Sequence, residues 1–174
     1  MKLVETRVPG AFVISLERQS DERGFFARTY CRSELAAAGL DPHIEQCSLS
    51  YNEHEGTLRG MHWQAAPSLE AKLVRCVTGA IYDVVVDMRP DSPAHLQWFG
   101  ITLDTIARDS LYIPAGCAHG FLTLTDRAEV FYQISGTYAP TAARGVRWDD
   151  PKLAIAWPRP PTVISERDRA YALL

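Results

Sequence analysis

Residues 56–64 read Gly-Thr-Leu-Arg-Gly-Met-His-Trp-Gln, and residues 72–79 read Lys-Leu-Val-Arg-Cys-Val-Thr-Gly. The short β-prone runs at 57–61 and 71–77 are bounded by glycines, which predicts two neighbouring strands of a small all-β domain. Polar side chains interrupt both runs, and a charge buried without a partner is costly. We therefore expect the polar members to face one shared cavity, a candidate active site. They are Arg59, His62, Gln64, Lys72 and Arg75.

The rest of the chain continues the β pattern. The β-prone segments lie roughly 8–14 residues apart, which is the spacing of a sandwich or barrel. The further expected strands cover residues 11–17, 25–30, 44–50, 81–87, 98–103, 110–113, 120–124 and 128–135. Residues 33–39 predict one short helix with a serine cap and a glycine stop. Beyond Gly136 the chain becomes proline-rich, and we expect this tail to wrap the β core with one or two helical turns.

The chain of 174 residues is expected to form one domain, 1–174, with a sizeable core. Its 47% apolar and 22% charged residues are ordinary for a globular protein. A net charge of -3 and the absence of a basic block argue against nucleic-acid binding. The chain shows no signal-peptide pattern and no apolar run of membrane-spanning length, so we expect a cytoplasmic protein without a membrane partner. Four cysteines lack CxxC spacing, and we expect them to be buried free thiols: Cys31, Cys47, Cys76 and Cys117.

Two spacings resemble those of cupins, small jelly-roll barrels that are often built round a metal. His62 and Gln64 follow a glycine that opens one strand, and His119 follows a Pro-Ala-Gly turn. Metal-binding cupins usually carry three histidines and a carboxylate at four positions, which here are His62, Gln64, Lys72 and His119. A protonated lysine repels a divalent cation and cannot coordinate it. We therefore predict a metal-free site, in which His62 accepts a proton and Lys72 stabilises negative charge on an oxygen.

Taken together, the motifs resemble the dTDP-4-dehydrorhamnose 3,5-epimerase family. Each motif is weak alone, but they occur in order over almost the whole chain, and their joint order is specific. The matching segments are 21–26 (DERGFF), 58–64 (LRGMHWQ), 72–75 (KLVR), 83–89 (DVVVDMR) with Ser92-Pro93, 114–121 (PAGCAHGF), Tyr132 with Tyr138, 148–151 (WDDP), 155–158 (IAWP) and 165–168 (SERD).

The resemblance implies a homodimeric cupin that inverts carbons flanking the C4 ketone of a nucleoside-diphosphate 4-keto-6-deoxyhexose, with a dTDP-linked sugar as the expected substrate. No cofactor is implied, because the ketone itself acidifies the neighbouring C–H bonds. His62 would be the base, and Asp168 would orient its imidazole. Lys72 would hold the enolate oxygen, and Tyr132 would return a proton from the opposite face. Two groups are needed because a single base that returns its own proton regenerates the starting sugar.

The same resemblance assigns the substrate-binding residues. They are Arg23 and Arg59 for the diphosphate, Phe26, Gln46 and Tyr138 for the nucleoside or sugar, and His119 for the sugar pocket. Arg23 would arrive from the N-terminal arm of a partner subunit, and an N-terminal strand would be exchanged in the dimer. Asp83 and Asp87 share one face of their strand, where salt bridges to Lys72 or Arg89 explain them as well as catalysis does.

Three alternatives stay open from the sequence. The family contains enzymes that invert only one centre, and residues 27–29 and Ser48 depart from its usual pattern near the expected nucleotide. A single-centre epimerase acting on a differently linked 4-keto sugar is therefore the first alternative. The second is a metal-dependent cupin that uses His62, Gln64 and His119. The third is a sugar-nucleotide binding module without catalysis.

Overall fold

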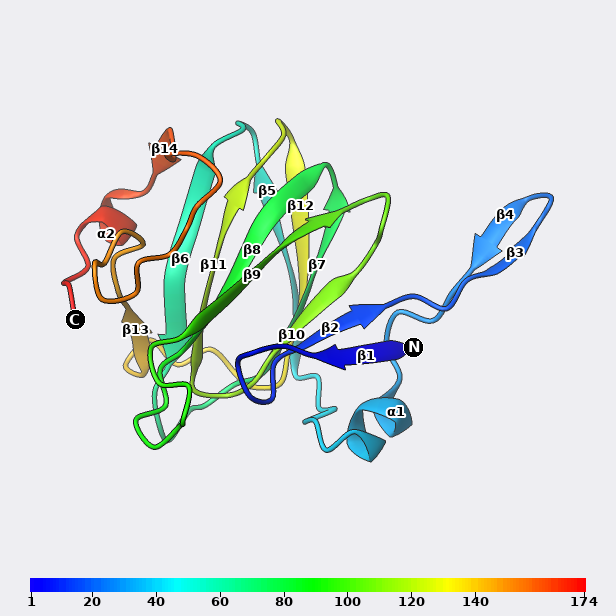
Figure 1. Ribbon diagram of the computed structural model, residues 1–174, viewed down its shortest axis with the longest axis horizontal. Helices are drawn as coiled ribbons and strands as arrows, with labels where there is room; N and C mark the ends of the chain where they lie inside the picture. Colours follow the sequence, from blue (N-terminus) through cyan, green and yellow to red (C-terminus); the bar gives the residue numbers. More distant parts are fainter.

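A computed structural model describes residues 1–174 and shows two β sheets packed face to face (Figure 1). In spatial order, the first sheet contains β1 (Lys2–Glu5), β2 (Phe12–Ser15), β10 (Ser110–Ile113), β7 (Lys72–Thr78), β12 (Ala128–Ile134) and β5 (Gln46–Asn52). The second contains β13 (Ala143–Gly145), β6 (Thr57–Gln64), β11 (Cys117–Thr123), β8 (Ala80–Asp87) and β9 (Trp98–Asp104). A short strand β14 (Val163–Ile164) runs parallel to β6. The predicted all-β sandwich of the cupin type is confirmed.

Every predicted strand has a counterpart, although the expected run 25–30 is strand only as far as Phe26, and one predicted pairing is wrong. The sequence runs at 57–61 and 71–77 were expected to be neighbours, whereas β6 and β7 belong to opposite sheets. The connection between them crosses from the second sheet to the first. Their side chains therefore meet across the interior of the sandwich and not side by side on one surface.

The predicted helix is present as α1 (Arg32–Ala37), but its cap differs from the prediction. Cys31 is the N-cap residue and makes no side-chain capping bond, while Ser33 lies inside the first turn. The glycine stop is confirmed, because Gly39 follows the helix with a φ of +74°. A second short helix, α2 (Glu166–Arg169), lies in the tail, and Ser165 caps it by accepting a hydrogen bond from the Asp168 N–H.

Three apolar clusters hold the layers together. The main cluster of 13 buried residues fills the space between the sheets and includes Val74 and Val130 of the first sheet and Val85 and Phe121 of the second. A second cluster packs α1 against the outer face of the first sheet. The third covers the outer face of the second sheet, where Leu153 of the tail joins residues of β6, β8 and β11. The tail thus wraps the sandwich, as the sequence predicts.

The strands β3 (Gln19–Asp21) and β4 (Gly24–Phe26) form a hairpin that projects away from the sandwich (Figure 1). This hairpin pairs with neither large sheet. The strand β1 pairs with β2 of its own chain, so strand exchange stays a prediction. On the outer face of the first sheet, Leu49, Tyr51 and Val77 are exposed.

All four cysteines are free thiols. Cys76 and Cys117 are buried as expected, but Cys31 is only half-buried and Cys47 is exposed, so the prediction of burial is wrong for these two. Cys47 lies on the outward side of the edge strand β5, where no further strand covers it. The protein has no helix with the length and apolar character needed to cross a membrane.

Candidate active site

A cavity of about 410 Å³ opens between the two sheets. Side chains from β5, β6, β7, β11 and β12 line it, and α2 closes one side. All four residues predicted to act in catalysis lie here, together with two of those predicted to bind substrate. They are His62, Lys72, Tyr132 and Asp168, with Arg59 and His119.

A β-bulge in β6 directs two of these side chains into the cavity. His62 lies opposite His119 of β11, whereas Arg59 lies opposite Phe121, so three steps along β6 match two along β11. In a regular strand, residues three positions apart point to opposite faces. The extra residue in β6 shifts the alternation of side chains by one position. Arg59 and His62 therefore face the same space.

Glycine at position 60 allows this bulge. Gly60 has a φ of +139°, a backbone conformation that residues with a side chain rarely adopt. A Cβ added at Gly60 would lie 2.5 Å from the Cα of Gly120 on the adjacent strand. The close approach of the two strands at this point thus requires the absence of a side chain.

His62 and Asp168 form the predicted pair, although 106 positions separate them in the chain. His62 Nε2 lies 2.7 Å from Asp168 Oδ1, and Asp168 Oδ2 accepts a hydrogen bond from the Gly60 N–H at 3.2 Å. Burial raises the pKa of the Asp168 carboxyl, but the hydrogen bonds and charge of its partners, His62 first among them, bring this pKa below its ordinary value. An ionised carboxylate only accepts hydrogen bonds, so Nε2 carries the proton in the neutral ring. Nδ1 is then the nitrogen that can accept a proton from a substrate.

Lys72 is held by a carboxylate that the sequence did not point to. Its Nζ lies 2.7 Å from Glu70 Oε1, and both side chains are about nine-tenths buried. The other Glu70 oxygen accepts a hydrogen bond from Gln64 Nε2 at 2.8 Å. The ammonium group is therefore fixed in place at the cavity wall, where it can stabilise a developing oxyanion.

Two of the five polar residues expected to share the cavity do not line it. Gln64 uses its amide within a local network, in which Oε1 accepts a hydrogen bond from the Ala139 N–H. Arg75 lies three positions after Lys72 on a strand without a bulge at that point, so it points to the opposite face of the sheet. There its guanidinium donates to Ser110 Oγ at 2.8 Å.

Tyr132 enters the cavity from β12 of the first sheet, opposite the strands that carry His62 and His119. The rings of Tyr132 and His119 meet edge to face, with centroids 5.7 Å apart. Burial and the negative charge of Asp83 raise the pKa of the Tyr132 phenol well above its ordinary value, and Arg59 offsets only part of this. The phenol therefore stays protonated at neutral pH and can donate a proton.

Two arginines give the cavity a positive margin. Arg59 donates through Nε to Asn52 Oδ1 at 2.7 Å, and Arg167 donates to the Tyr171 hydroxyl at 2.8 Å. Neither forms an ion pair within the chain. Guanidinium groups without a carboxylate partner suit the oxygens of a diphosphate.

A smaller hollow of about 140 Å³ adjoins the main cavity and shares His62, Lys72 and Arg167 with it. Tyr138 lines this hollow, and its side chain is exposed enough to stack on a planar group. Gln46 accepts a hydrogen bond from the Tyr138 N–H at 3.2 Å. Gln46 therefore positions the Tyr138 backbone and lines neither hollow.

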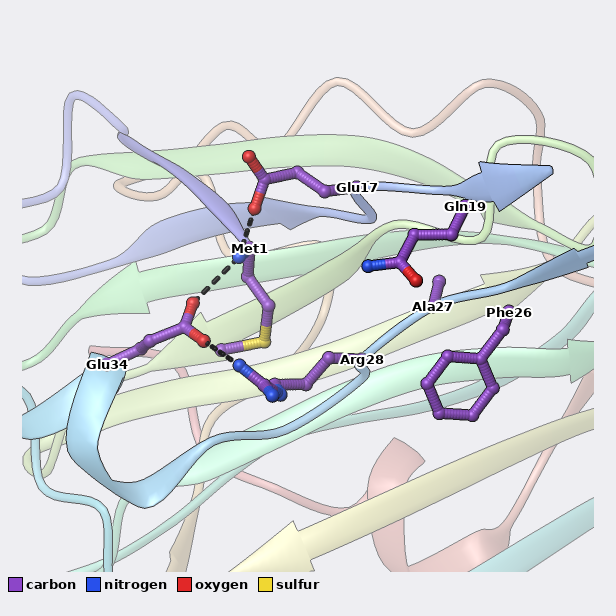
Figure 2. A pocket seen from close by; sticks show the side chains of 7 residues that line it. All are labelled: Met1, Glu17, Gln19, Phe26, Ala27, Arg28 and Glu34. Atoms are coloured by element: carbon purple, nitrogen blue, oxygen red, sulfur yellow. Dashed lines mark hydrogen bonds and ion pairs between the residues drawn. The ribbon is translucent and has the colours of Figure 1, made fainter.

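Arg23 and Phe26 lie outside the cavity of their own chain. Both belong to the projecting hairpin, where Arg23 pairs with Asp21 and its side chain is 82% exposed. Phe26 is 76% exposed and borders a separate pocket beside Arg28 and Glu34 (Figure 2). Their predicted contact with substrate is thus not made within one chain, and their delivery by a partner stays a prediction.

Several residues at the site were missed in the sequence. Arg167 stands next to Asp168 in the quoted segment 165–168, and that proximity was a usable signal. Ser50 alternates along β5 with Ser48, which the family pattern already places near the nucleotide, and this period of two marks an inward polar face. Tyr171, whose ring lies 5.7 Å from that of His62, gave no signal.

The donor set does not resemble a metal site. No group of three or more histidine, cysteine or acidic side chains is arranged to hold a metal ion. His62 bonds to Asp168 and His119 to Asp83, while Gln64 is committed to its own network. His62 and His119 thus share the cavity, but each is held by its own carboxylate and Gln64 does not join them, so the three residues form no common donor set.

The all-β sandwich brings a lysine, a tyrosine and a histidine–aspartate pair around one cavity, groups that together can move protons at a carbon beside a carbonyl. The chain belongs to the dTDP-4-dehydrorhamnose 3,5-epimerase family, whose sequence profile matches residues 5–174. This confirms the family resemblance and identifies the protein as an isomerase.

Individual relatives match over nearly the full chain. The dTDP-4-dehydrorhamnose 3,5-epimerase of Shigella flexneri is 36% identical over 169 residues, covering 97% of this chain and 93% of that protein. The dTDP-4-dehydrorhamnose 3-epimerase of Streptomyces niveus is 39% identical over 175 residues, covering 100% and 84%. The crystal structure of dTDP-4-dehydrorhamnose 3,5-epimerase from Bacillus anthracis, with TDP and PPi bound, superposes with a TM-score of 0.94 at 38% identity, covering 99% of each chain.

Proposed function

We propose that this protein converts dTDP-4-dehydro-6-deoxy-D-glucose to dTDP-4-dehydro-L-rhamnose by inverting C3 and C5 without a metal or cofactor. One observation carries the mechanism. His62 and Tyr132 come from opposite sheets and line the same cavity. A sugar ring held between the sheets would present one face to the imidazole and the other to the phenol.

In this mechanism His62 Nδ1 takes the proton from the carbon beside the ketone, and the C–H electron pair moves into the C3–C4 or C4–C5 bond. The carbonyl π pair moves onto the C4 oxygen, and the Lys72 ammonium stabilises that oxyanion. Tyr132 then donates its phenolic proton to the same carbon from the other face as the ketone re-forms. Solvent reprotonates the phenolate and removes the proton from His62. Asp168 stays ionised throughout and stabilises the imidazolium, as an aspartate does in a serine-protease triad.

The nucleotide assignment has separate support. The Bacillus anthracis relative binds TDP. In this chain, Arg59 and Arg167 are free to contact a diphosphate, and Tyr138 can stack on a base. Inversion of C3 alone is a second candidate, because the Streptomyces niveus relative is a 3-epimerase of comparable identity. Proton NMR of the product from dTDP-, GDP- and CDP-linked 4-keto sugars would identify both the nucleotide and the inverted carbons.

Replacing Tyr132 with phenylalanine is expected to separate the two proton transfers. In heavy water the wild type should place deuterium at C3, C5 or both, with inversion. Tyr132→Phe should still exchange through His62, but inversion should slow by about 10²–10⁴-fold, the usual contribution of a positioned acid. Equal loss of exchange and inversion would contradict separate roles for the two residues. Binding without any exchange by the wild type would favour a non-catalytic module, and stoichiometric metal with chelator-sensitive activity would favour the metal-dependent alternative.

We also propose that the active form is a homodimer in which each projecting hairpin reaches the partner's cavity. An isolated two-stranded hairpin is marginally stable, so this one needs a surface to rest on. Arg23 and Phe26 are exposed on the hairpin. Neither lines the cavity between the large sheets of its own chain. The exposed apolar side chains on the outer face of the first sheet offer a contact surface for a second copy.

Mixed dimers test this arrangement. Arg23→Ala and His62→Ala are each expected to be nearly inactive alone. Co-expressed as heterodimers, they should regain about a quarter of wild-type activity, because half the dimers are mixed and one site in each has an intact arm and base. Two tagged chains and tandem purification would isolate the mixed species. If the hairpin served its own chain, the mixture would regain no activity.

A further inference from the structure

A second carboxylate–imidazole pair stands in the cavity wall, and the proposed mechanism does not use it. His119 Nε2 lies 2.7 Å from Asp83 Oδ1, and both residues are buried, with exposed fractions of 5% and 0%. The sequence left Asp83 open between a salt bridge and catalysis. It forms no bond to Lys72, which pairs with Glu70 instead.

The pair lies between the proposed base and the proposed acid. His119 is the direct cross-strand neighbour of His62, and its ring meets the Tyr132 ring edge to face at 5.7 Å. Asp83 lies on β8, which pairs with β11 on the side away from β6, and its carboxylate holds the His119 imidazole by a hydrogen bond. A hydrogen-bonded ring in this position restricts where the Tyr132 side chain can lie.

Asp83 differs from the other buried aspartate on the same strand. Both Asp87 oxygens accept hydrogen bonds, from Arg89 and from Ser92, which is the pattern of a structural salt bridge. Asp83 Oδ2 is buried and has no hydrogen-bond partner. A buried, unpaired carboxylate oxygen costs stability, and such groups call for a functional reason.

We propose that Asp83 and His119 form a positioning pair for Tyr132, in which the carboxylate fixes the imidazole and the imidazole holds the phenol at the sugar face opposite His62. This inference rests on the proposed role of Tyr132 as the proton donor. Neither Asp83 nor His119 needs to exchange a proton with the substrate.

The charge of Asp83 adds a pH signature to this geometry. Asp83 raises the pKa of Tyr132, so its removal lets the phenol ionise at lower pH. A proton donor fails once it ionises, and the alkaline loss of activity should therefore move to lower pH. The other charged or titratable groups around the cavity are Arg59 and His62 of β6, Lys72 of β7, and Arg167 and Asp168 of α2. The variants below leave all of these in place.

Asp83→Asn keeps the shape and the acceptor oxygen but removes the charge. We expect it to slow inversion by about tenfold or more while leaving deuterium exchange through His62 intact, and to move the alkaline limb of kcat to lower pH. Asp87→Asn is the matched control, because it removes a buried charge from the same strand without facing Tyr132. That control should lower the melting temperature without moving the alkaline limb. In a Tyr132→Phe background, Asp83→Asn should slow inversion no further.

A second variant keeps the test decisive if Asp83→Asn does not fold. His119→Gln leaves the Asp83 charge in place and removes the ring. Because His119 also lines the sugar cavity, the readout is the ratio of inversion to exchange at saturating substrate, which should fall while the alkaline limb is retained. The inference is overturned if the tested Asp83 or His119 variant loses exchange and inversion in equal measure, or if Asp83→Asn matches Asp87→Asn. Failure of the proposed function looks different, because the wild type itself would then neither exchange nor invert the 4-keto sugar.

Discussion

His62→Ala is expected to lose both deuterium exchange and epimerisation, each by about 10²–10⁴-fold or to the limit of detection. The His62 imidazole lines the cavity, the buried Asp168 carboxylate holds its Nε2 and can stabilise its charged form, and its other ring nitrogen makes no hydrogen bond within the chain. Without it the C–H bond beside the ketone has no base, so neither the exchange nor the inversion can begin. Exchange is measured by NMR in heavy water with the 4-keto sugar nucleotide.

The control for this change is His54→Ala, which removes an exposed histidine from a loop near the same strand. Its exchange and epimerisation rates should equal those of the wild type. His62→Ala should also still bind the nucleotide, since the arginines are untouched. Isothermal titration calorimetry with TDP measures this binding. Exchange at the wild-type rate in His62→Ala would show that another group removes the proton and would refute the assignment.

The second large effect is expected from Gly60→Ala. The added Cβ would lie 2.5 Å from the Gly120 Cα, and the residue would have to keep a φ of +139°. Overpacking and unfavourable backbone conformation together predict a loss of about 3 kcal/mol or more in the free energy of unfolding. Any folded remainder should be inactive, because a shifted bulge turns Arg59 and His62 away from each other. Denaturant unfolding followed by circular dichroism measures the first effect.

Gly24→Ala separates the two causes. Gly24 has a φ of +130°, close to that of Gly60, but a Cβ there meets nothing within 4 Å. Gly24→Ala should therefore lower the free energy of unfolding only through its unfavourable backbone conformation, by about 1 kcal/mol. If the two variants lose equal stability, the contact between β6 and β11 is not what requires glycine at position 60.

Local sequence patterns predicted the class of fold but not the way strands meet. Alternating and β-branched runs located every large strand, because side-chain period depends on a few adjacent residues. The pairing of β6 was not predictable in this way, since the bulge depends on contact between Gly60 and Gly120, far apart in the chain. Arg75 is a different case, because the local period of a regular strand already turns it to the face opposite Lys72.

The site shows the same division. His62 and Lys72 stand out as polar residues in apolar strands, and their cavity could be inferred from the cost of burying them unpaired. Asp168 came only from family resemblance, because no spacing rule links it to His62. Glu70 was missed because an acidic residue in a polar connection is ordinarily solvated, and only the folded chain shows it buried against Lys72.

The order in which the chain is made has a bearing on when the enzyme becomes competent. Every member of the main apolar cluster lies between residues 8 and 130, whereas the carboxylate that orients His62 sits at 168, on a segment joined to β6 through β14. During translation the sandwich interior can thus be complete while the imidazole still lacks its anchor. The core residues therefore precede the anchor of the imidazole in the chain, and completion of the site requires docking of α2.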